Sequence, residues 1–286
     1  MHIGGSDART RAVLLAAAPV TVALTLGIIP VIILFTESLI WAATPELSGM
    51  LAAYSRVSES VYLEILGRSV LLGVVLTAAC LVVAYPVTYW LAHHCPPQRR
   101  VLLLVLLTLP LWLNYVVLNY VWVWILARGG LVNHLLGVVH PSLAPVRLLY
   151  TELSLTVGFL YIYLPYVILT LYVAMERLDD ALLAAAADLG ASRMRLVTDV
   201  IVPQTAAGAA AGALIVYARI AGAFATPEIL GGPQQQLIAQ LITDAFLEVL
   251  DLRFAAALAF SFLAVISFIL LVGLTSRQLR RELRRW

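Results

Sequence analysis

The sequence predicts an all-α, polytopic membrane protein with six transmembrane helices, and three observations lead to this fold class. Of the 286 residues, 62% are hydrophobic and only 12% are charged, whereas soluble domains carry about 25% charged residues. Six windows are long and apolar enough to cross the roughly 30 Å of membrane hydrocarbon as helices. All 18 basic residues are arginine, and nearly all of them lie between or beside these windows.

The predicted spans, in chain order, are Ala12–Thr36, Ser69–Leu91, Val101–Leu126, Leu153–Met175, Ala206–Ala225 and Phe254–Thr275. The first resembles a secretion signal because Arg9 and Arg11 precede it. Its apolar stretch exceeds the roughly 7–15 residues of a signal core and no small-residue cleavage site follows, so we expect it to be retained. Prolines within or at the ends of spans, such as Pro86, Pro110 and Pro165, predict kinked helices around a cavity.

The arginines predict an orientation. With the N-terminus in the cytoplasm, 12 of the 18 arginines fall in cytoplasmic segments and five on the opposite face, while Arg219 lies inside the fifth span. Because cytoplasmic loops carry an excess of positive charge, both termini are expected to be cytoplasmic. The basic tail is expected to be a membrane-surface anchor in contact with lipid. A solvated helix end with interfacial arginines is as good an interpretation of it as a specific partner contact.

We divide the chain into three parts. Residues 1–64 form a cytoplasmic segment, the first span and an outer loop. Residues 65–275 form a core of five spans with a cytoplasmic hairpin at 176–203, and residues 276–286 form the tail. In the outer segments, the short apolar stretch Leu131–Leu136 is expected to lie at the interface or dip back into the membrane. The stretch from Leu237 to Phe246 has helical apolar spacing and is expected to be an amphipathic helix.

No site for covalent chemistry is predicted, so the chain is not expected to be an enzyme or to hold a cofactor. It has no glycine-rich phosphate loop of the GxxxxGK[ST] kind and is not expected to bind ATP. A net charge of +2 is too small to suggest nucleic acid. His93 and His94 are interpreted as a chance loop pair rather than a metal site. Cys80 and Cys95 show no metal-ligand pattern.

The segment from Asp179 to Pro203 is the longest polar interruption between two spans, and it predicts two short amphipathic helices. Asp180 is expected to cap the first helix, because its carboxylate can accept from free N–H groups of the first turn. Gly190 is expected to end that helix in the left-handed conformation. Ser192 is expected to cap the second helix and Pro203 to end it. On these residues alone, a docking surface for a soluble partner and a simple interfacial connector are equally good interpretations.

This hairpin resembles the cytoplasmic loop of binding-protein-dependent ABC importer permeases, in which EAA is followed by three residues, Gly, nine residues and Ile-x-Leu-Pro. Ala184 stands where that pattern has glutamate, but Gly190 and Pro203 have the matching spacing. In this family the loop sits in a groove of the ATPase subunit and transmits nucleotide-driven closure to the spans. The expected ATPase-coupling residues are Asp180, Ala184, Ala185, Ala186, Gly190, Ser192, Arg193, Arg195, Val200 and Pro203.

Four further segments, at 109–126, 129–136, 163–179 and 225–233, resemble the spermidine/putrescine permease branch, and the similarity runs from about residue 65 to the end. The resemblance implies the type I permease fold in the cytoplasmic membrane of a prokaryote. It also implies three kinds of partner: a second permease subunit in a heterodimer, two ATP-binding subunits that hold ATP and Mg, and an extracytoplasmic solute-binding protein. The expected mechanism is alternating access.

The solute stays open at this point. Polyamine is the first candidate, and an anionic or zwitterionic solute such as an opine, a phosphonate or an amino acid is the second. A different class, an ion-coupled secondary transporter, would favour inverted repeats and intramembrane carboxylates, and neither is evident in the sequence.

Polar and aromatic residues within the spans predict the translocation path, because polar side chains in a span usually face the protein interior. Arg219 sits roughly 20 Å into the fifth span. Facing the cavity, it would repel a polyamine and suit an anion, and Glu228 is placed to offset it. The alternative is that Arg219 extends toward the outer surface or pairs with a carboxylate of the partner permease. Many relatives carry arginine where Asn119 stands. The expected path residues are Asn114, Tyr115, Asn119, Trp122, Tyr163, Arg219 and Glu228.

Overall fold

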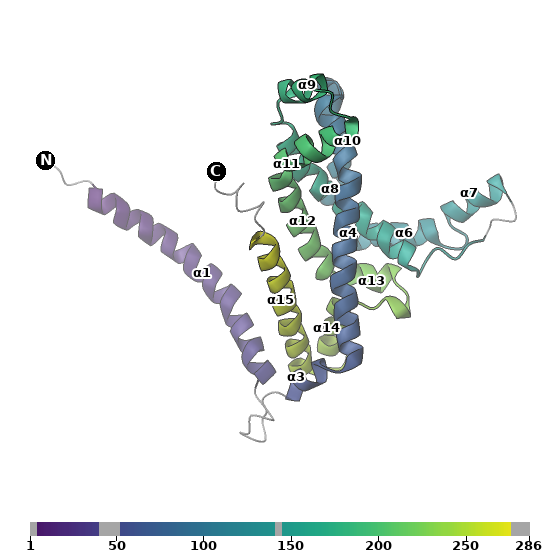
Figure 1. Cartoon of the computed structure of the whole chain (residues 1–286). Coiled ribbons are helices and arrows are strands. Elements are labelled where there is room, and N and C mark those ends of the chain that lie inside the picture. Colours follow the sequence, from purple (N-terminus) through teal and green to yellow (C-terminus); the bar gives the residue numbers. More distant parts are fainter. Residues whose placement is uncertain (1–4, 40–51, 141–144, 276–286) are drawn as a thin grey trace. The chain divides into compact units, whose positions relative to one another are not determined.

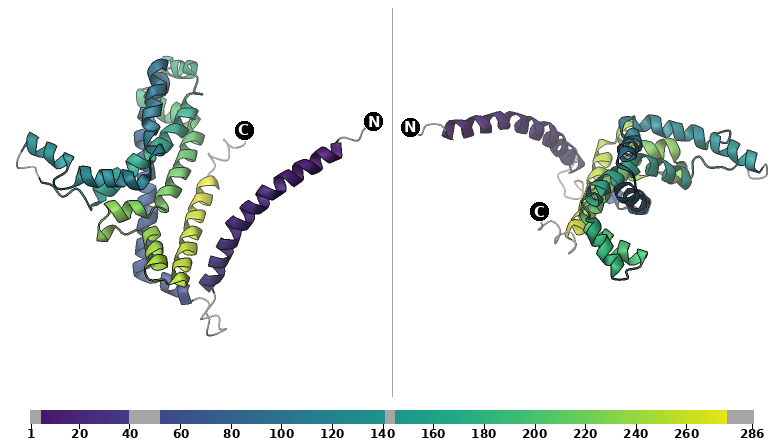
Figure 2. Two further views of the ribbon diagram at one scale, coloured as in Figure 1. Left: turned by 180° about the vertical axis from the view of Figure 1, so that it is seen from behind. Right: turned by 90° about the horizontal axis from the view of Figure 1, so that it is seen from above.

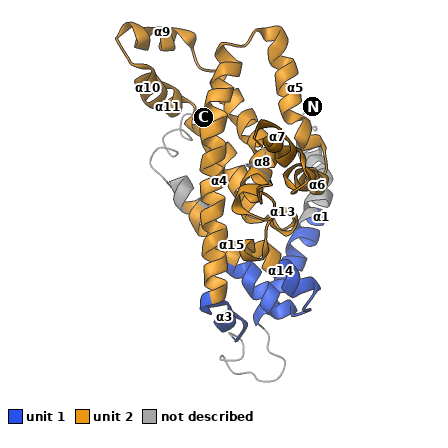
Figure 3. Ribbon diagram, turned by 90° about the vertical axis from the view of Figure 1, so that its right-hand side faces the viewer, with its two compact units in different colours: residues 1–60, 242–261 blue, residues 61–241, 262–286 orange. Residues whose placement is uncertain are grey.

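The structure is a computed structural model that describes residues 5–39, 52–140 and 145–275. Every regular element in these ranges is a helix, as predicted. The chain divides into two compact units, one of residues 1–60 with 242–261 and one of residues 61–241 with 262–286 (Figure 3). The predicted basic tail, 276–286, lies outside the described residues.

The longer helices are α1 (Gly5–Leu39), α4 (Ser60–His93), α5 (Pro97–Trp112), α6 (Tyr115–Leu126), α8 (Glu152–Met175), α12 (Ala206–Ala221) and α15 (Leu252–Thr275) (Figure 1). The shorter helices are α3 (Ala52–Val57), α7 (Leu131–Val139), α9 (Asp180–Asp188), α10 (Arg193–Arg195), α11 (Val202–Gln204), α13 (Ala225–Leu230) and α14 (Ile238–Leu247). A π-helical turn, Leu196–Ile201, joins α10 to α11, and a 3₁₀ turn, Pro233–Gln235, precedes α14. The amphipathic helix predicted beyond Leu237 is therefore α14.

Four helical stretches in the described residues are long and apolar enough to cross a membrane: α4, α6 with α7, α8, and Leu252–Ile269 of α15. A fifth is obtained if α12 and the helical segment Arg193–Gln204 before it, which meet at 73°, form one broken span. The first predicted span lies within α1, whose side chains are described only from Thr21 onward. Its residues before Thr21, and Ala23, therefore lie outside the described side chains.

The third predicted span, Val101–Leu126, was wrong as a single helix. α5 ends at Trp112 and α6 begins at Tyr115, because the backbone is extended at Leu113 and Asn114. The Asn114 side chain accepts a hydrogen bond from the backbone N–H of Val116 at 2.8 Å, which is the ordinary role of asparagine at a helix start. A polar residue in an apolar run marked a helix boundary here.

The core of the larger unit is built around α8, which packs closely against α12. Phe159, Leu171 and Met175 of α8 are fully buried. A Cβ atom on Gly208 of α12 would lie 2.7 Å from the carbonyl oxygen of Thr170, and one on Gly212 would lie 2.4 Å from its hydroxyl. Small residues four apart allow helix backbones to approach this closely. The sequence signal for this contact is the Gly-x-x-x-Gly pattern of Gly208 and Gly212, which was not among the predicted features.

The smaller unit contains an ion pair between Arg56 and Asp251, whose atoms lie 2.8 Å apart. The Arg56 guanidinium also lies 4.1 Å from the centre of the Phe254 ring. Burial raises the pKa of Asp251, but hydrogen bonds from the Phe254 backbone N–H and from Arg56 outweigh it. The pKa of this carboxyl is therefore held below its ordinary value of 3.8.

Candidate functional site

The first helix of the hairpin, α9, begins one residue earlier than predicted. Asp179, not Asp180, is the cap, because the Asp179 carboxylate accepts from the backbone N–H of Ala181 at 2.9 Å. Asp180 is the first residue inside the helix. Two adjacent aspartates offer the same capping chemistry, and position within the local backbone decides between them.

The elbow of the hairpin forms as expected. Gly190 has a φ angle of +82°, in the left-handed region, and a Cβ there would meet nothing within 4 Å. The glycine is therefore required by backbone conformation and not by crowding. Ser192 caps the second helix by accepting from the backbone N–H of Arg195 at 3.3 Å.

The second helix departs from the prediction at its end. It widens into a π-helical turn, Leu196–Ile201, in which the Val202 N–H donates to the carbonyl of Val197. Pro203 does not end it, because helical structure continues to Gln204 and breaks at Thr205. Pro203 follows the π-helical turn directly, inside the helical segment Arg193–Gln204.

The hairpin exposes apolar side chains at its elbow. Leu189 is 89% exposed and Met194 is 72% exposed, and no residue of α9 is buried. Of the residues predicted to couple to an ATPase, Ala184, Ala185, Arg193 and Arg195 are exposed, and Ala186 and Val200 are half-buried. These apolar side chains are uncovered within the chain and are available to a partner.

The start of α9 contacts the end of α4, a contact that was not predicted. His93 Nδ1 lies 2.8 Å from Asp180 Oδ1, and the His93 side chain is 9% exposed while that of Asp180 is 85% exposed. Because a carboxylate only accepts, the imidazole Nδ1–H donates. The two residues are 87 positions apart, and the sequence holds no local signal that pairs them.

A pocket of about 460 Å³ lies within the larger unit, between the α5–α6 break, α8 and the end of α12. Of the predicted path residues, Asn114, Tyr115, Tyr163 and Arg219 line it. The Arg219 guanidinium lies 4.8 Å from the centre of the Tyr166 ring, which also lines the pocket. This is within the range of a cation–π interaction. None of the described residues that line this pocket is acidic.

Three predicted path residues do not line this pocket. Asn119 is fully buried and donates to the Thr226 hydroxyl of α13 at 3.1 Å. Trp122 packs edge-on against Tyr161, with ring centres 5.5 Å apart. The Glu228 carboxylate is exposed and accepts from the Gln240 amide. In these contacts Asn119 and Trp122 join α6 to its neighbours, a role that their polarity alone does not distinguish from lining a path.

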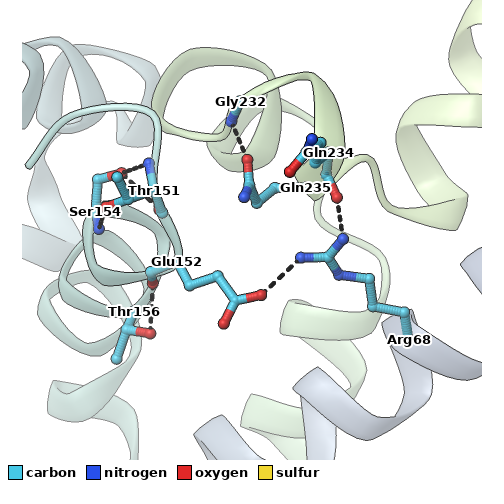
Figure 4. Close-up of polar contacts among 8 residues, drawn as sticks. All are labelled: Arg68, Thr151, Glu152, Ser154, Thr156, Gly232, Gln234 and Gln235. Atoms are coloured by element: carbon cyan, nitrogen blue, oxygen red, sulfur yellow. Dashed lines mark hydrogen bonds and ion pairs between the residues drawn. The ribbon is translucent and has the colours of Figure 1, made fainter. Parts of the chain in front are cut away.

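A second polar cluster lies at the far end of α4 from the hairpin (Figure 4). Arg68 donates to the backbone carbonyl of Gln234 and, at 2.9 Å, to the Glu152 carboxylate. The Gln235 side chain accepts from the Gly232 N–H at 2.8 Å. One arginine thus joins α4, the first turn of α8 and the turn before α14.

The chain is similar in sequence to a known family of membrane proteins. The family described as "Binding-protein-dependent transport system inner membrane component" matches residues 84–284. The spermidine/putrescine transport system permease protein PotB of Escherichia coli (strain K12) is 36% identical over 222 residues, which is 77% of this chain and 79% of that protein. PotB of Haemophilus influenzae is 32% identical over 219 residues, or 77% of this chain and 76% of that protein.

A more distant relative has another solute in its name. The probable molybdenum ABC transporter permease protein of Haloferax volcanii is 27% identical over 218 residues, covering 76% of this chain and 77% of that protein. Among solved structures, a bacterial ABC transporter involved in the import of the acidic polysaccharide alginate has a chain that matches with a TM-score of 0.74 at 16% identity. That match covers 96% of this chain and 98% of the other. A second structure, the bacterial alginate ABC transporter in complex with an alginate pentasaccharide-bound periplasmic protein, matches with a TM-score of 0.72. At this identity the two structures establish the fold.

Proposed function

The chain belongs to the family of binding-protein-dependent transport system inner membrane components, the permease subunits of ABC importers, and from this premise we propose how it works. It imports a polyamine such as spermidine or putrescine by alternating access. It catalyses no reaction itself and is driven by two ATP-binding subunits, which hold ATP and Mg. A second, different permease subunit completes the membrane channel, and an extracytoplasmic protein delivers the solute.

The observation that carries this proposal is the exposed hairpin elbow. Leu189 and Met194 are large apolar side chains with 89% and 72% exposure, on a segment that protrudes beside the C-terminal end of α4 (Figure 1 and Figure 2). Burying such a side chain contributes about 1.5–3 kcal/mol. An ATPase groove that covers both side chains would remove this apolar surface from water. The chain is proposed to lie with both termini, and therefore the hairpin, on the cytoplasmic side.

Docking is tested by co-purification. The chain is co-expressed with the second permease, the ATPase subunits and the binding protein of its transporter, and retention of the ATPase subunits is measured. Leu189→Asp with Met194→Asp is expected to weaken retention at least tenfold, the effect of losing central contacts in an interface. Val249→Asp is the matched control, because Val249 is 71% exposed but lies between α14 and α15, proposed to be on the outer side. Equal retention by both variants would show that the hairpin does not dock.

The energy source is tested with vesicles that contain the whole complex and labelled spermidine. Uptake is expected to require ATP inside the vesicle and to survive collapse of the ion gradients. Uptake that persists without ATP and stops when the gradients collapse would identify an ion-coupled carrier instead.

The pocket favours a second candidate solute. Arg219 places a cation in it, and none of the described lining residues is acidic. A polyamine would be repelled there, whereas a carboxylate or phosphonate would be attracted. The sequence similarity to PotB supports polyamine, and Arg219 supports an anionic or zwitterionic solute. Competition of labelled spermidine uptake by putrescine and by an amino acid or phosphonate decides between them.

A further inference from the structure

The hairpin is tied to α4 at both of its ends. At its start, Asp180 accepts from His93 at 2.8 Å. At its end, the Thr205 hydroxyl lies 3.2 Å from the hydroxyl of Tyr85, two turns earlier on α4. Thr205 is fully buried and stands at the 73° bend between α11 and α12. These two contacts join the same helix to the first and last positions of the hairpin.

At the start of the hairpin, a single polar side-chain contact joins α9 to a long helix. Among the described residues, His93–Asp180 is the one side-chain hydrogen bond or ion pair between α9 and a long helix, and α9 buries no residue of its own. Apolar support comes from Leu183, which packs half-buried against the core. Besides this hydrogen bond and Leu183, α9 packs against the π-helical turn Leu196–Ile201 of the same hairpin.

The length of α4 makes this connection mechanically relevant. Its 34 residues extend about 50 Å, against roughly 30 Å of membrane hydrocarbon. His93 lies in its last turn, and Arg68, in the polar cluster at the other end, contacts α8 and the turn before α14. α4 therefore connects the hairpin at one end to the polar cluster at the other, with Pro86 inside the helix between the two.

We infer that His93 and Tyr85 are positioning residues that make α4 move together with the hairpin, so that displacement of the hairpin reaches the far side of the membrane through α4. This inference rests on the proposed docking of the hairpin to an ATPase. His93 holds the start of the hairpin through Asp180, and Tyr85 holds its end through Thr205. Neither residue touches solute or nucleotide.

The test measures the distance between α4 and α9 in the assembled complex. Spin labels are placed at Trp90→Cys on α4 and Ala187→Cys on α9, both at exposed positions, after the two buried cysteines, Cys80 and Cys95, are changed to alanine. Distances are recorded by pulsed electron paramagnetic resonance without nucleotide and with ATP plus vanadate. In the parent complex, one narrow distance is expected in both states.

His93→Leu removes the donor and keeps an apolar side chain of similar bulk. It is expected to lower the ratio of molecules at the narrow parent distance to molecules at other distances by about fivefold, the upper end for an ion pair that is partly exposed. The distance is also expected to change when ATP is added. His93→Asn is expected to restore the narrow distance, because its amide nitrogen takes the place of Nδ1. His94→Leu is the matched control: His94 is exposed, and its ring lies as near Tyr89 as that of His93.

Tyr85→Phe removes only the hydroxyl that contacts Thr205. Combined with His93→Leu, it is expected to broaden the distance more than either change alone. An unchanged distance in His93→Leu, or equal broadening in His94→Leu, would overturn the inference. Failure of docking is read separately, as loss of ATPase subunits from the purified complex, so the distance is interpreted only in complexes that retain them.

Discussion

Adding a single methyl group at Gly208 tests the packing on which the larger unit depends. A Cβ there would lie 2.6 Å from the Cβ of Ala174 and 2.7 Å from the carbonyl oxygen of Thr170. Neither atom can move away by rotating a side chain, so α8 and α12 would have to separate. Overpacking of this kind costs about 1–3 kcal/mol. Alanine regains about 1 kcal/mol as the better helix former, which leaves a net loss of up to about 2 kcal/mol.

The assay is the thermal unfolding midpoint of the purified protein in detergent. A loss of 1 kcal/mol lowers the midpoint by about 2–4 °C in a chain of this size, so Gly208→Ala is expected to lower it by up to about 8 °C. Gly67→Ala is the matched control, because Gly67 lies in α4 and a Cβ there meets nothing within 4 Å. It is expected to raise the midpoint slightly. If Gly208→Ala unfolds at or above the midpoint of Gly67→Ala, α8 and α12 do not pack as described.

Three further predictions concern the pocket, the elbow and pH. Arg219→Ala is expected to lower the KM for spermidine uptake several-fold, because one repelling charge is removed; an unchanged solute preference would remove Arg219 from the path. Gly190→Ala is expected to weaken ATPase retention more than Gly190→Asn, since a left-handed backbone costs most residues about 1–2 kcal/mol but suits asparagine; equal retention contradicts this. The lowered pKa of Asp251 means that its pairing stabilises the fold above the unfolded pKa, near 3.8, and is lost as pH falls through the folded pKa. Asp251→Asn is therefore expected to lose less stability than the parent when the pH falls from about 6 to about 3. The difference is at most about 1 kcal/mol, because the pair is partly exposed. Parallel curves of thermal unfolding midpoint against pH for the two proteins would refute this.

Local signals predicted the hairpin well. Gly190 and Ser192 perform the roles expected of them, because a left-handed cap and a serine cap depend only on backbone geometry within a few residues. The cap at Asp179 and the end at Gln204 each differ from the prediction by one residue. At that scale, neighbouring residues with the same chemistry are not distinguished by sequence.

Contacts between residues far apart in the chain could not be predicted from the sequence. Asn119 is a polar residue in a predicted span, and such a residue either lines the translocation path or makes a packing contact. The structure gives it Thr226 as a partner, 107 positions away. His93 was interpreted as part of a chance loop pair. The structure places it in the last turn of α4, and its partner Asp180 is 87 positions away. The prediction at Asn114 failed for a different reason. Asn114 caps a helix within an apolar run, and that run was predicted to be one continuous span.

The wide turn at Leu196–Ile201 has a consequence for insertions and deletions. A regular α-helix rotates by about 100° for each added residue, so a length change elsewhere in the hairpin helices would turn the elbow relative to Thr205. A π-helical turn already accommodates an extra residue through i→i+5 bonding, as Val202 to Val197 shows. Deleting one residue there would restore a regular helix. A one-residue deletion in this turn is therefore expected to change the direction of the elbow less than a one-residue deletion in α9.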